Sequence, residues 1–477
     1  MSLSQPSPAG DALLHEPRRE LLPSLLAAHL ETVAERCEAA GQPLPGFVLR
    51  ELRELVGCGD LSQGFYRATC TGCGLDRIVG FSCKRRSLCP RCGGRRMAQR
   101  ALWWRQRVLP RVPVRQWVLT LPVPLRLRLA WDDDLRKAIL AVVLRTIFGH
   151  LKRAAKKRGL QAPRCGAITA VQRFGSALNL NIHFHILLPD GVFCRQSPQH
   201  RPHFVSIQPT TEDVQHIVWK IARRVHRLLE RRGLLEEGLC PDEQEHPFHR
   251  ASVSGRTVLG ERPNQPIARL RQRDMFGKPA TKLSRWCALS RGFNLHAGVR
   301  VGRHQRDRLE RLCRYIARPP LALDRLKQRQ DGKILLTLKR PWSDGTRALL
   351  FDPEAFVERL CALIWKPRVN TVHYHGVFAS GSAWRAEVVP DGMRRQNRAR
   401  QRRAQGKPLS FNERWVLWLS LLSHVFDFDE RCPGCGAKAW VFDTVIGPWR
   451  VRRELMALGI ERSPREFAPA RGPPTLW

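Results

Sequence analysis

Residues 165–193 read CGAITAVQRFGSALNLNIHFHILLPDGVF, and this stretch decides the fold. Within residues 182–188, apolar side chains alternate with His183 and His185. This alternation has the period of a β-strand, so one face of the strand is apolar and the other carries both histidines. The apolar run at 166–174 and the polar break after it predict a hairpin whose second strand holds the histidines.

The two histidines are candidate metal ligands. Residues two apart on a strand point the same way, so His183 and His185 can hold one metal ion between them. The alternative is a solvated or hydrogen-bonded pair, because the chain has 16 histidines and repeats the spacing at His373 and His375. We interpret His373 as incidental.

The charge of the chain predicts a polyanionic partner. A length of 477 residues indicates about three domains. The 82 Lys and Arg residues against 42 Asp and Glu give a net charge of +40. Such an excess favours binding to nucleic acid or to an anionic membrane, and the planar guanidinium group of arginine suits phosphate.

Nucleic acid is the favoured partner. The sequence has no run of about 18 or more apolar residues, and residues 1–20 lack the basic-then-apolar order of a signal peptide. We therefore expect no membrane partner and a cytoplasmic, DNA-associated protein. In that reducing compartment the 15 cysteines predict metal ligands or free thiols rather than disulfides.

Six cysteines between residues 58 and 92 predict a structural zinc-binding unit. One Cys-x2-Cys pair lies at Cys70 and Cys73, another lies at Cys89 and Cys92, and fifteen residues separate the two pairs. Two such pairs can close a four-cysteine Zn²⁺ site, which leaves no position for water. The spare cysteines, Cys58 and Cys83, leave two alternatives open: a different choice of four ligands, or two metal ions.

A further pair, Cys432 and Cys435, lies in a lone CPGCG knuckle. Two thiolates do not complete a zinc tetrahedron. The open alternatives are recruitment of His424, of a distant cysteine or of another protomer, or no bound metal at all.

Arginines are threaded through the cysteine-rich unit. They include Arg85, Arg86, Arg95 and Arg96. These side chains predict contacts to DNA phosphates, and a merely solvated basic face is the alternative.

Residues 307–320, DRLERLCRYIARPP, predict a helix that two prolines end. Tyr315 lies at the edge of its apolar face, with Arg311 and Arg308 one and two turns back. A tyrosine placed beside two guanidinium groups can meet a phosphate. The alternative is a packing tyrosine, although the chain has only three tyrosines from which to choose.

The remaining patterns predict an α+β fold with an antiparallel sheet. Helices are expected at 21–57, 134–158, after a capping box formed by Thr210 and Asp213, and at 411–428. Strands are expected at 115–123, 334–351 and 369–378. Residues 235–295 are polar and irregular, and loops are expected there.

Together these features resemble the HUH-type rolling-circle transposases of the insertion-sequence 91 family, including the common-region elements. Five ordered stretches carry the resemblance, which covers most of the chain. They are CTGCGLDRIVGFSCKRRSLCPRCGGRRM, WVLTLPVPLR, GSALNLNIHFHILLPDGVF, RLERLCRYIARPP with LKRPWSDGT, and YHGVFA with the later CPGCG.

The resemblance implies an HUH-endonuclease-like antiparallel sheet with flanking helices and a bacterial DNA enzyme. His183 and His185 would bind Mg²⁺ or Mn²⁺ with a third polar ligand, for which three alternatives remain: Gln172, Asn179 and Asp190. Tyr315 would attack single-stranded DNA at element ends and target DNA, leaving a 5′-phosphotyrosine link and a free 3′-hydroxyl. The link conserves the energy of the broken bond, so no ATP is needed, and no GxxxxGK[ST] motif is present.

The resulting domain prediction has six parts. They are a helical lead-in (1–57), a zinc-binding domain (58–100), an HUH catalytic domain (101–325), a C-terminal extension of the catalytic region (326–392), a basic linker (393–410), and a C-terminal helix with the lone knuckle (411–477).

One departure limits the resemblance, and two rival functions remain open. Some family members have two tyrosines one helical turn apart, whereas the position one turn after Tyr315 is Pro319 here, which predicts the single-tyrosine variety. A plasmid replication initiator or relaxase with the same chemistry would also explain the site. A non-catalytic zinc-dependent DNA-binding regulator would explain the charge and the cysteines alone.

Overall fold

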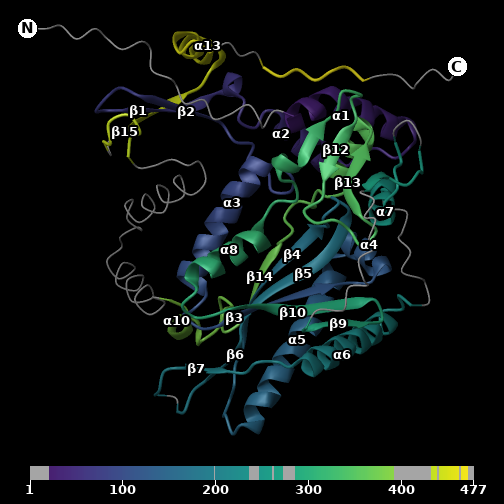
Figure 1. The fold of residues 1–477 in the computed structure, drawn as a ribbon, viewed down its shortest axis with the longest axis vertical. Coiled ribbons are helices and arrows are strands. Elements are labelled where there is room, and N and C mark those ends of the chain that lie inside the picture. Colours follow the sequence, from purple (N-terminus) through teal and green to yellow (C-terminus); the bar gives the residue numbers. More distant parts are fainter. Residues whose placement is uncertain are drawn as a thin grey trace, which may run out of the picture.

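The computed structural model describes residues 21–197, 199–235, 246–259, 263–271, 285–390, 431–437, 440–460 and 464–470. It shows a mixed helix-and-sheet fold in which all paired strands are antiparallel (Figure 1). The linker predicted at 393–410, the helix predicted at 411–428 and His424 lie outside the described residues.

The centre of the molecule is a six-stranded sheet with the order β14-β4-β5-β3-β10-β9. Its strands are β3 (Val114–Thr120), β4 (Gly166–Phe174), β5 (Leu180–Pro189), β9 (Cys287–Ser290), β10 (Phe293–Val301) and β14 (Val372–Gly376). Strands β4 and β5 are the predicted hairpin, and the antiparallel pairing confirms that prediction. Every residue of β4 is buried, so the hairpin lies inside the molecule rather than at its edge.

Helices cover both faces of this sheet. On one face Ile182, Phe184 and Ile186 pack in a core with α4 (Val123–Trp131), α5 (Asp133–Lys157) and α6 (Thr211–Glu230). The predicted capping box starts α6. On the other face, alternate residues of β4 and β5 pack against α8 (Arg306–Ala317) and the end of α3 (Pro90–Trp103), which continues as a π-helix at Trp104–Val108. Figure 1 shows α3 and α8 crossing this second face.

A second core lies beside the central sheet. It joins α1 (Leu21–Ala39), α2 (Gly46–Val56), α7 (Pro247–Ser254) and α9 (Pro353–Cys361) to a four-stranded sheet. The order of that sheet is β11-β12-β13-β8, with β8 (Ala268–Arg271), β11 (Leu326–Gln328), β12 (Ile334–Thr337) and β13 (Thr346–Phe351). The predicted helices near the start of the chain are therefore present, and their apolar faces share one core with α9 and the four-stranded sheet, which come much later in the sequence.

The third sheet is small and has the order β15-β1-β2. Strands β1 (Phe65–Cys70) and β2 (Asp76–Gly80) form a hairpin, and β15 (Trp440–Val445) pairs with the free side of β1. Helix α13 (Pro448–Ala457) covers it (Figure 1). The cysteine-rich unit and a segment from the other end of the chain thus share one sheet.

The expectation of loops at 235–295 is wrong for much of the described part of that range. Helix α7 and strands β8 and β9 lie in it, and β10 begins there and enters the central sheet beside β3. The register of β10 shifts between His296 and Val299, which interrupts the alternation that marks a strand in sequence. Short elements complete the fold: β6 (Gly191–Cys194) paired with β7 (His203–Ser206), α10 (Arg385–Val388), and 3₁₀ turns at Leu61–Gln63 and Leu323–Arg325.

Candidate active site

His183 and His185 lie on the face of the central sheet that α8 covers. Their Nε2 atoms face each other at 3.0 Å, and both side chains are buried. Neighbouring ligands of an octahedral ion with bonds of about 2.1 Å are about 3 Å apart. The separation of the two nitrogens therefore fits the shared divalent cation that the sequence predicts.

The other ring nitrogens fix the two imidazoles. Nδ1 of His183 donates to the carbonyl oxygen of Asn181 at 2.8 Å, which leaves a lone pair on Nε2. The amide of Gln116 lies 2.7 Å from Nδ1 of His185. Burial lowers the pKa of His183 to about 4 and that of His185 well below its ordinary value. Both rings are consequently neutral at pH 7, the form in which imidazole binds metal.

Gln172 places an unpaired oxygen beside the histidines. It opposes His183 across the ladder between β4 and β5, and its Nε2 donates to the carbonyl oxygen of Ile316 at 2.6 Å. Its Oε1 is buried and has no hydrogen-bond partner among the described residues. An unpaired buried oxygen costs free energy, and a cation held by the histidines would remove that cost.

The other two alternatives for a third ligand are less well placed. Both carboxylate oxygens of Asp190 are occupied, because Arg115 donates to them at 2.7 and 3.0 Å and Arg300 donates at 2.8 Å. Asn179 lies in the turn between the two strands, outside the ladder that sets Gln172 opposite His183. Gln172 therefore fits the third position best.

Tyr315 meets this site from α8. Its ring is edge-on to His185, with 5.9 Å between the ring centroids, and 46% of the residue is exposed. Leu309, Leu312 and Ile316 are buried on the apolar face of the helix, and Tyr315 lies at the edge of that face. The predicted helix is thus confirmed, and its tyrosine is both accessible and adjacent to the histidine pair.

Arg318 is a residue that the sequence reasoning missed. Its guanidinium carbon lies 4.1 Å from the centroid of the Tyr315 ring, and its Nη1 is buried without a hydrogen-bond partner in the part of the chain that the structure describes. The available signal was its position three residues after Tyr315, just before the two prolines that stop the helix. A buried guanidinium nitrogen without a partner beside a candidate nucleophile is suited to an oxygen of phosphate.

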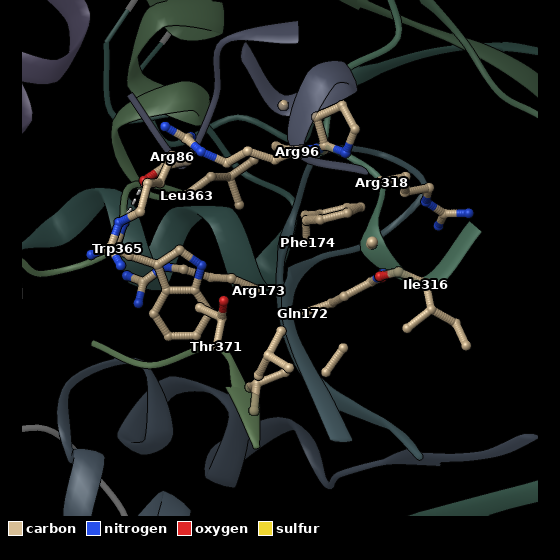
Figure 2. A pocket seen from close by; sticks show the side chains of 18 of the residues that line it. Arg86, Arg96, Gln172, Arg173, Phe174, Ile316, Arg318, Leu363, Trp365 and Thr371 are labelled. Carbon is tan, nitrogen blue, oxygen red and sulfur yellow. Dashed lines mark hydrogen bonds between the residues drawn. The ribbon is translucent and has the colours of Figure 1, made fainter. Parts of the chain in front are cut away.

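Two hollows rich in arginine adjoin the site. The first, about 80 Å³, lies between α3, β4 and the end of α8, and Figure 2 shows Gln172, Arg318, Arg86 and Arg96 around it. The second, about 440 Å³, is lined by Arg91, Arg95, Arg314, Arg318, Arg325 and Lys339. No Asp or Glu is among the described residues that line the second hollow. Burial and the neighbouring Arg318 lower the pKa of Lys339, as expected where like charges gather.

The arginines predicted to contact DNA fall into three groups. Arg86 and Arg96 line the first hollow and Arg95 lines the second. Arg308 and Arg311 are exposed on the stripe of α8 that carries Tyr315. Arg85 instead forms an ion pair with Glu54 at the surface.

One group of four cysteines gathers at the start of α3. It consists of Cys58, Cys83, Cys89 and Cys92, whose sulfurs all lie within 4.8 Å of one another. Individual pairs are 3.4 to 3.7 Å apart, too far for a disulfide bond. Zinc–sulfur bonds of about 2.3 Å place tetrahedral ligands about 3.8 Å apart. The cluster therefore has the dimensions of a closed zinc site.

The structure does not bring Cys70 and Cys73 together with Cys89 and Cys92. The first pair is at the turn of the β1–β2 hairpin, whereas the second caps and begins α3, and the two pairs belong to different clusters. Cys58 and Cys83 are ligand candidates rather than spares. Cys70 and Cys73 lie instead with Cys432 and Cys435, the pair of the CPGCG knuckle.

Two family models match the chain. Residues 166–385 match the model described as "Putative transposase". Residues 26–121 match the "Transposase zinc-binding domain" model of the insertion-sequence 91 type. These matches support a transposase of the insertion-sequence 91 family. No curated protein and no solved structure matches the chain.

The candidate active-site residues and the cysteine cluster at α3 fall in different matched ranges. The transposase range contains His183, His185, Gln172 and Tyr315, and the zinc-binding range contains all four cysteines of the cluster at α3. A transposase processes and binds DNA, which agrees with a net charge of +40. The zinc-binding match and the cysteine clusters support structural Zn²⁺. Among the described residues no helix has the length and apolar content to cross a lipid bilayer.

Proposed function

We propose that this transposase nicks and rejoins single-stranded DNA at element ends through a 5′-phosphotyrosine intermediate, as in rolling-circle transposition. The observation that carries the proposal is the position of Tyr315, edge-on to one of two buried histidines whose Nε2 atoms converge at 3.0 Å. The site would be of the HUH type with a single tyrosine, because Pro319 occupies the position one turn on.

His183, His185 and the oxygen of Gln172 would hold the Mg²⁺ or Mn²⁺ ion. When bound, the ion polarises the scissile phosphate and offsets the charge that develops on its oxygens. The mixed nitrogen and oxygen ligands favour Mn²⁺ somewhat more than an all-oxygen site would.

In the proposed reaction the hydroxyl oxygen of Tyr315 attacks the scissile phosphorus and loses its proton to solvent. The new bond joins the tyrosine oxygen to phosphorus, and the bond from phosphorus to the 3′-oxygen breaks. The 3′-oxygen takes up a proton and leaves as a hydroxyl. Rejoining is the reverse exchange, in which a 3′-hydroxyl attacks the phosphotyrosine and restores the free tyrosine.

Arg318 would act on the phosphate itself. Its guanidinium lies over the Tyr315 ring, and the unpartnered Nη1 can donate to a non-bridging oxygen of the phosphate that the tyrosine attacks. The two hollows extend this positively charged surface away from the tyrosine. The DNA on either side of the scissile bond would therefore contact further guanidinium groups.

The test is a denaturing gel of the protein incubated with labelled single-stranded DNA from both element ends and Mn²⁺. Because the chain has three tyrosines, Tyr315→Phe can be compared with the complete set of controls, Tyr66→Phe and Tyr374→Phe. Tyr66 is exposed on the small sheet, and the Tyr374 hydroxyl accepts from Nε1 of Trp104 at 3.0 Å. We expect a covalent protein–DNA band that only Tyr315→Phe loses.

Three other outcomes would count against the proposal. A band that survives in Tyr315→Phe would assign the nucleophile elsewhere. DNA binding without any covalent band, on either end, would favour the non-catalytic regulator. Cleavage of a replication or transfer origin in preference to element ends would favour a replication initiator or relaxase with the same chemistry.

A further inference from the structure

We propose that Cys70, Cys73, Cys432 and Cys435 bind a second structural zinc ion, which fastens residues 431–460 to the cysteine-rich unit near the start of the chain. Neither matched family range includes the last two cysteines. Cys73 and Cys432 are 359 positions apart in sequence, yet their sulfurs are 3.5 Å apart.

The sulfur positions fit a zinc tetrahedron. Cys70 and Cys435 are 3.6 Å apart, and all four sulfurs lie within 4.8 Å of one another. These separations exclude a disulfide bond in this arrangement and approach the distance of about 3.8 Å between sulfurs on one zinc ion. Two Cys-x2-Cys pairs also supply the usual ligand set of a closed structural site.

The two loops that carry these cysteines have the same backbone structure. In CTGCGL the amide of Cys70 donates to the carbonyl of Leu75 at 2.9 Å, and in CPGCGA the amide of Cys432 donates to the carbonyl of Ala437 at 2.8 Å. The fifth residue of each loop is a glycine at φ +73°, and its amide donates back to the carbonyl of the first cysteine. Only glycine adopts this conformation at little cost. Two segments that lie far apart in the sequence thus adopt the same type of turn, one that is suited to binding metal.

The glycine inside each pair lets the two loops approach closely. A Cβ atom on Gly72 would lie 3.1 Å from the sulfur of Cys435, and one on Gly434 would lie 3.5 Å from the sulfur of Cys73. Each loop therefore packs its glycine against the other loop's thiol. This reciprocal contact is expected of two knuckles that share one ion. Two independent pairs of thiols would not require it.

The elements beside the loops hold the same two segments together. Strand β15 pairs with β1 along its whole length, from Phe65 opposite Val445 to Cys70 opposite Trp440. The core below is small, with six buried residues: Phe65, Ile78, Val445, Val451, Leu455 and Ile460. A core of this size supplies little stability by itself, and small units of this kind usually depend on a metal or a disulfide.

The first experiment counts zinc in the full-length protein. We expect two zinc ions per chain in wild type and one in Cys432→Ser/Cys435→Ser. Cys70→Ser/Cys73→Ser should also retain one, and so should the combined fourfold variant, because all four residues serve one ion. Cys165→Ser/Cys194→Ser changes two buried cysteines outside both clusters and should retain two. One zinc in wild type, or two in Cys432→Ser/Cys435→Ser, would overturn the proposal.

The second experiment needs no variant and so does not depend on a variant's folding. Cys73 and Cys435 are exposed, so a metal-free thiolate at either position should react quickly with N-ethylmaleimide. We expect both to resist modification in the zinc-loaded protein and to react together after a chelator is added, as read by peptide mass spectrometry. The partly buried Cys287 serves as a control whose rate the chelator should not change. Equal rates at Cys435 with and without chelator would contradict a zinc ion at this site.

Discussion

His183 and His185 in β5 and His373 and His375 in β14 share one spacing and one sheet, yet they lie on opposite faces of it. His185 opposes Ala170, whereas His373 opposes the neighbouring Thr169. Since adjacent residues of a strand point to opposite faces, the first pair faces α8 and the second faces the side of α5.

The surroundings of the two pairs differ as much as their faces do. The first pair has ring centroids 4.8 Å apart and converging Nε2 atoms, with Gln172 and Tyr315 beside them. The second pair is stacked at 6.2 Å with an interplanar angle of 29°, on a strand at the edge of the sheet. The comparison teaches that spacing on a strand fixes only a shared face, and that the residues opposite that face decide whether two histidines form a site.

The largest expected effect is on DNA cleavage, and it distinguishes the histidine pair of β5 from the histidine pair of β14. His183→Ala or His185→Ala should reduce formation of the covalent DNA complex by at least about a thousandfold, because each would remove a ligand of the proposed metal ion. His373→Ala and His375→Ala are the matched controls and should cleave at nearly the rate of wild type. The measurement is the single-turnover rate with Mn²⁺, with DNA binding followed separately. Loss of cleavage in the β14 variants alone would reverse our assignment of the two pairs.

A smaller effect is expected from the residues that oppose the two pairs. Gln172→Leu should weaken Mn²⁺ binding and raise the Mn²⁺ concentration needed for half-maximal cleavage by roughly 10- to 100-fold, since it would remove one proposed ligand of the ion. Thr169→Val makes a comparable change opposite His373, and it should leave the Mn²⁺ titration unaltered. An unchanged Mn²⁺ titration in Gln172→Leu would rule the glutamine out as a ligand.

The smallest expected effect is on stability in acid. Burial lowers the pKa of both His183 and His375 to about 4, whereas an unfolded histidine titrates near 6.5. Between pH 6.5 and 4 the unfolded chain therefore binds protons that the folded chain does not, and the free energy of unfolding falls as the pH falls. His183→Leu and His375→Leu should each flatten this decline, by about 1–3 kcal/mol for the more deeply buried His183.

Urea unfolding of the metal-free protein at pH 7.5 and pH 5 measures this effect. The fall in stability between the two pH values should be smaller in either variant than in wild type. If the leucine variants lost as much stability as wild type, the histidines would already be protonated in the folded chain at pH 5.

Features that depend on nearby residues could be predicted from the sequence. The β4–β5 hairpin follows from alternation, α6 from its capping box, and the accessible side of Tyr315 from the helical wheel of α8. The coarse assignment to transposases also agrees with the family matches. These features share one cause, since the periodicity of apolar residues and a helix-capping motif are both encoded within about ten neighbouring residues.

Features that depend on distant residues could not be predicted in the same way. Which cysteine pairs share an ion depends on β15 reaching β1, and nothing within either Cys-x2-Cys segment encodes that partner. Arg318 lies past the end of the helical pattern, so its stacking on Tyr315 depends on the turn before Pro319. The sequence offers Gln172 as one of three candidates for the third metal ligand, and only the register of β4 and β5 shows that it lies opposite His183.

The pairing of β1 with β15 also has a consequence for the order in which the protein is made. The ribosome produces β1 and its knuckle some 359 residues before the knuckle at Cys432. At about 5–20 residues per second, that delay is on the order of 20–70 seconds. During this delay, one edge of β1 lacks its pairing strand, and the thiols of Cys70 and Cys73 lack the other two cysteines of the proposed zinc site. A message broken before the codons of β15 would therefore yield a chain in which the sheet of β1 and β2 lacks its third strand, so completion of this sheet distinguishes chains that include β15 from chains that stop before it.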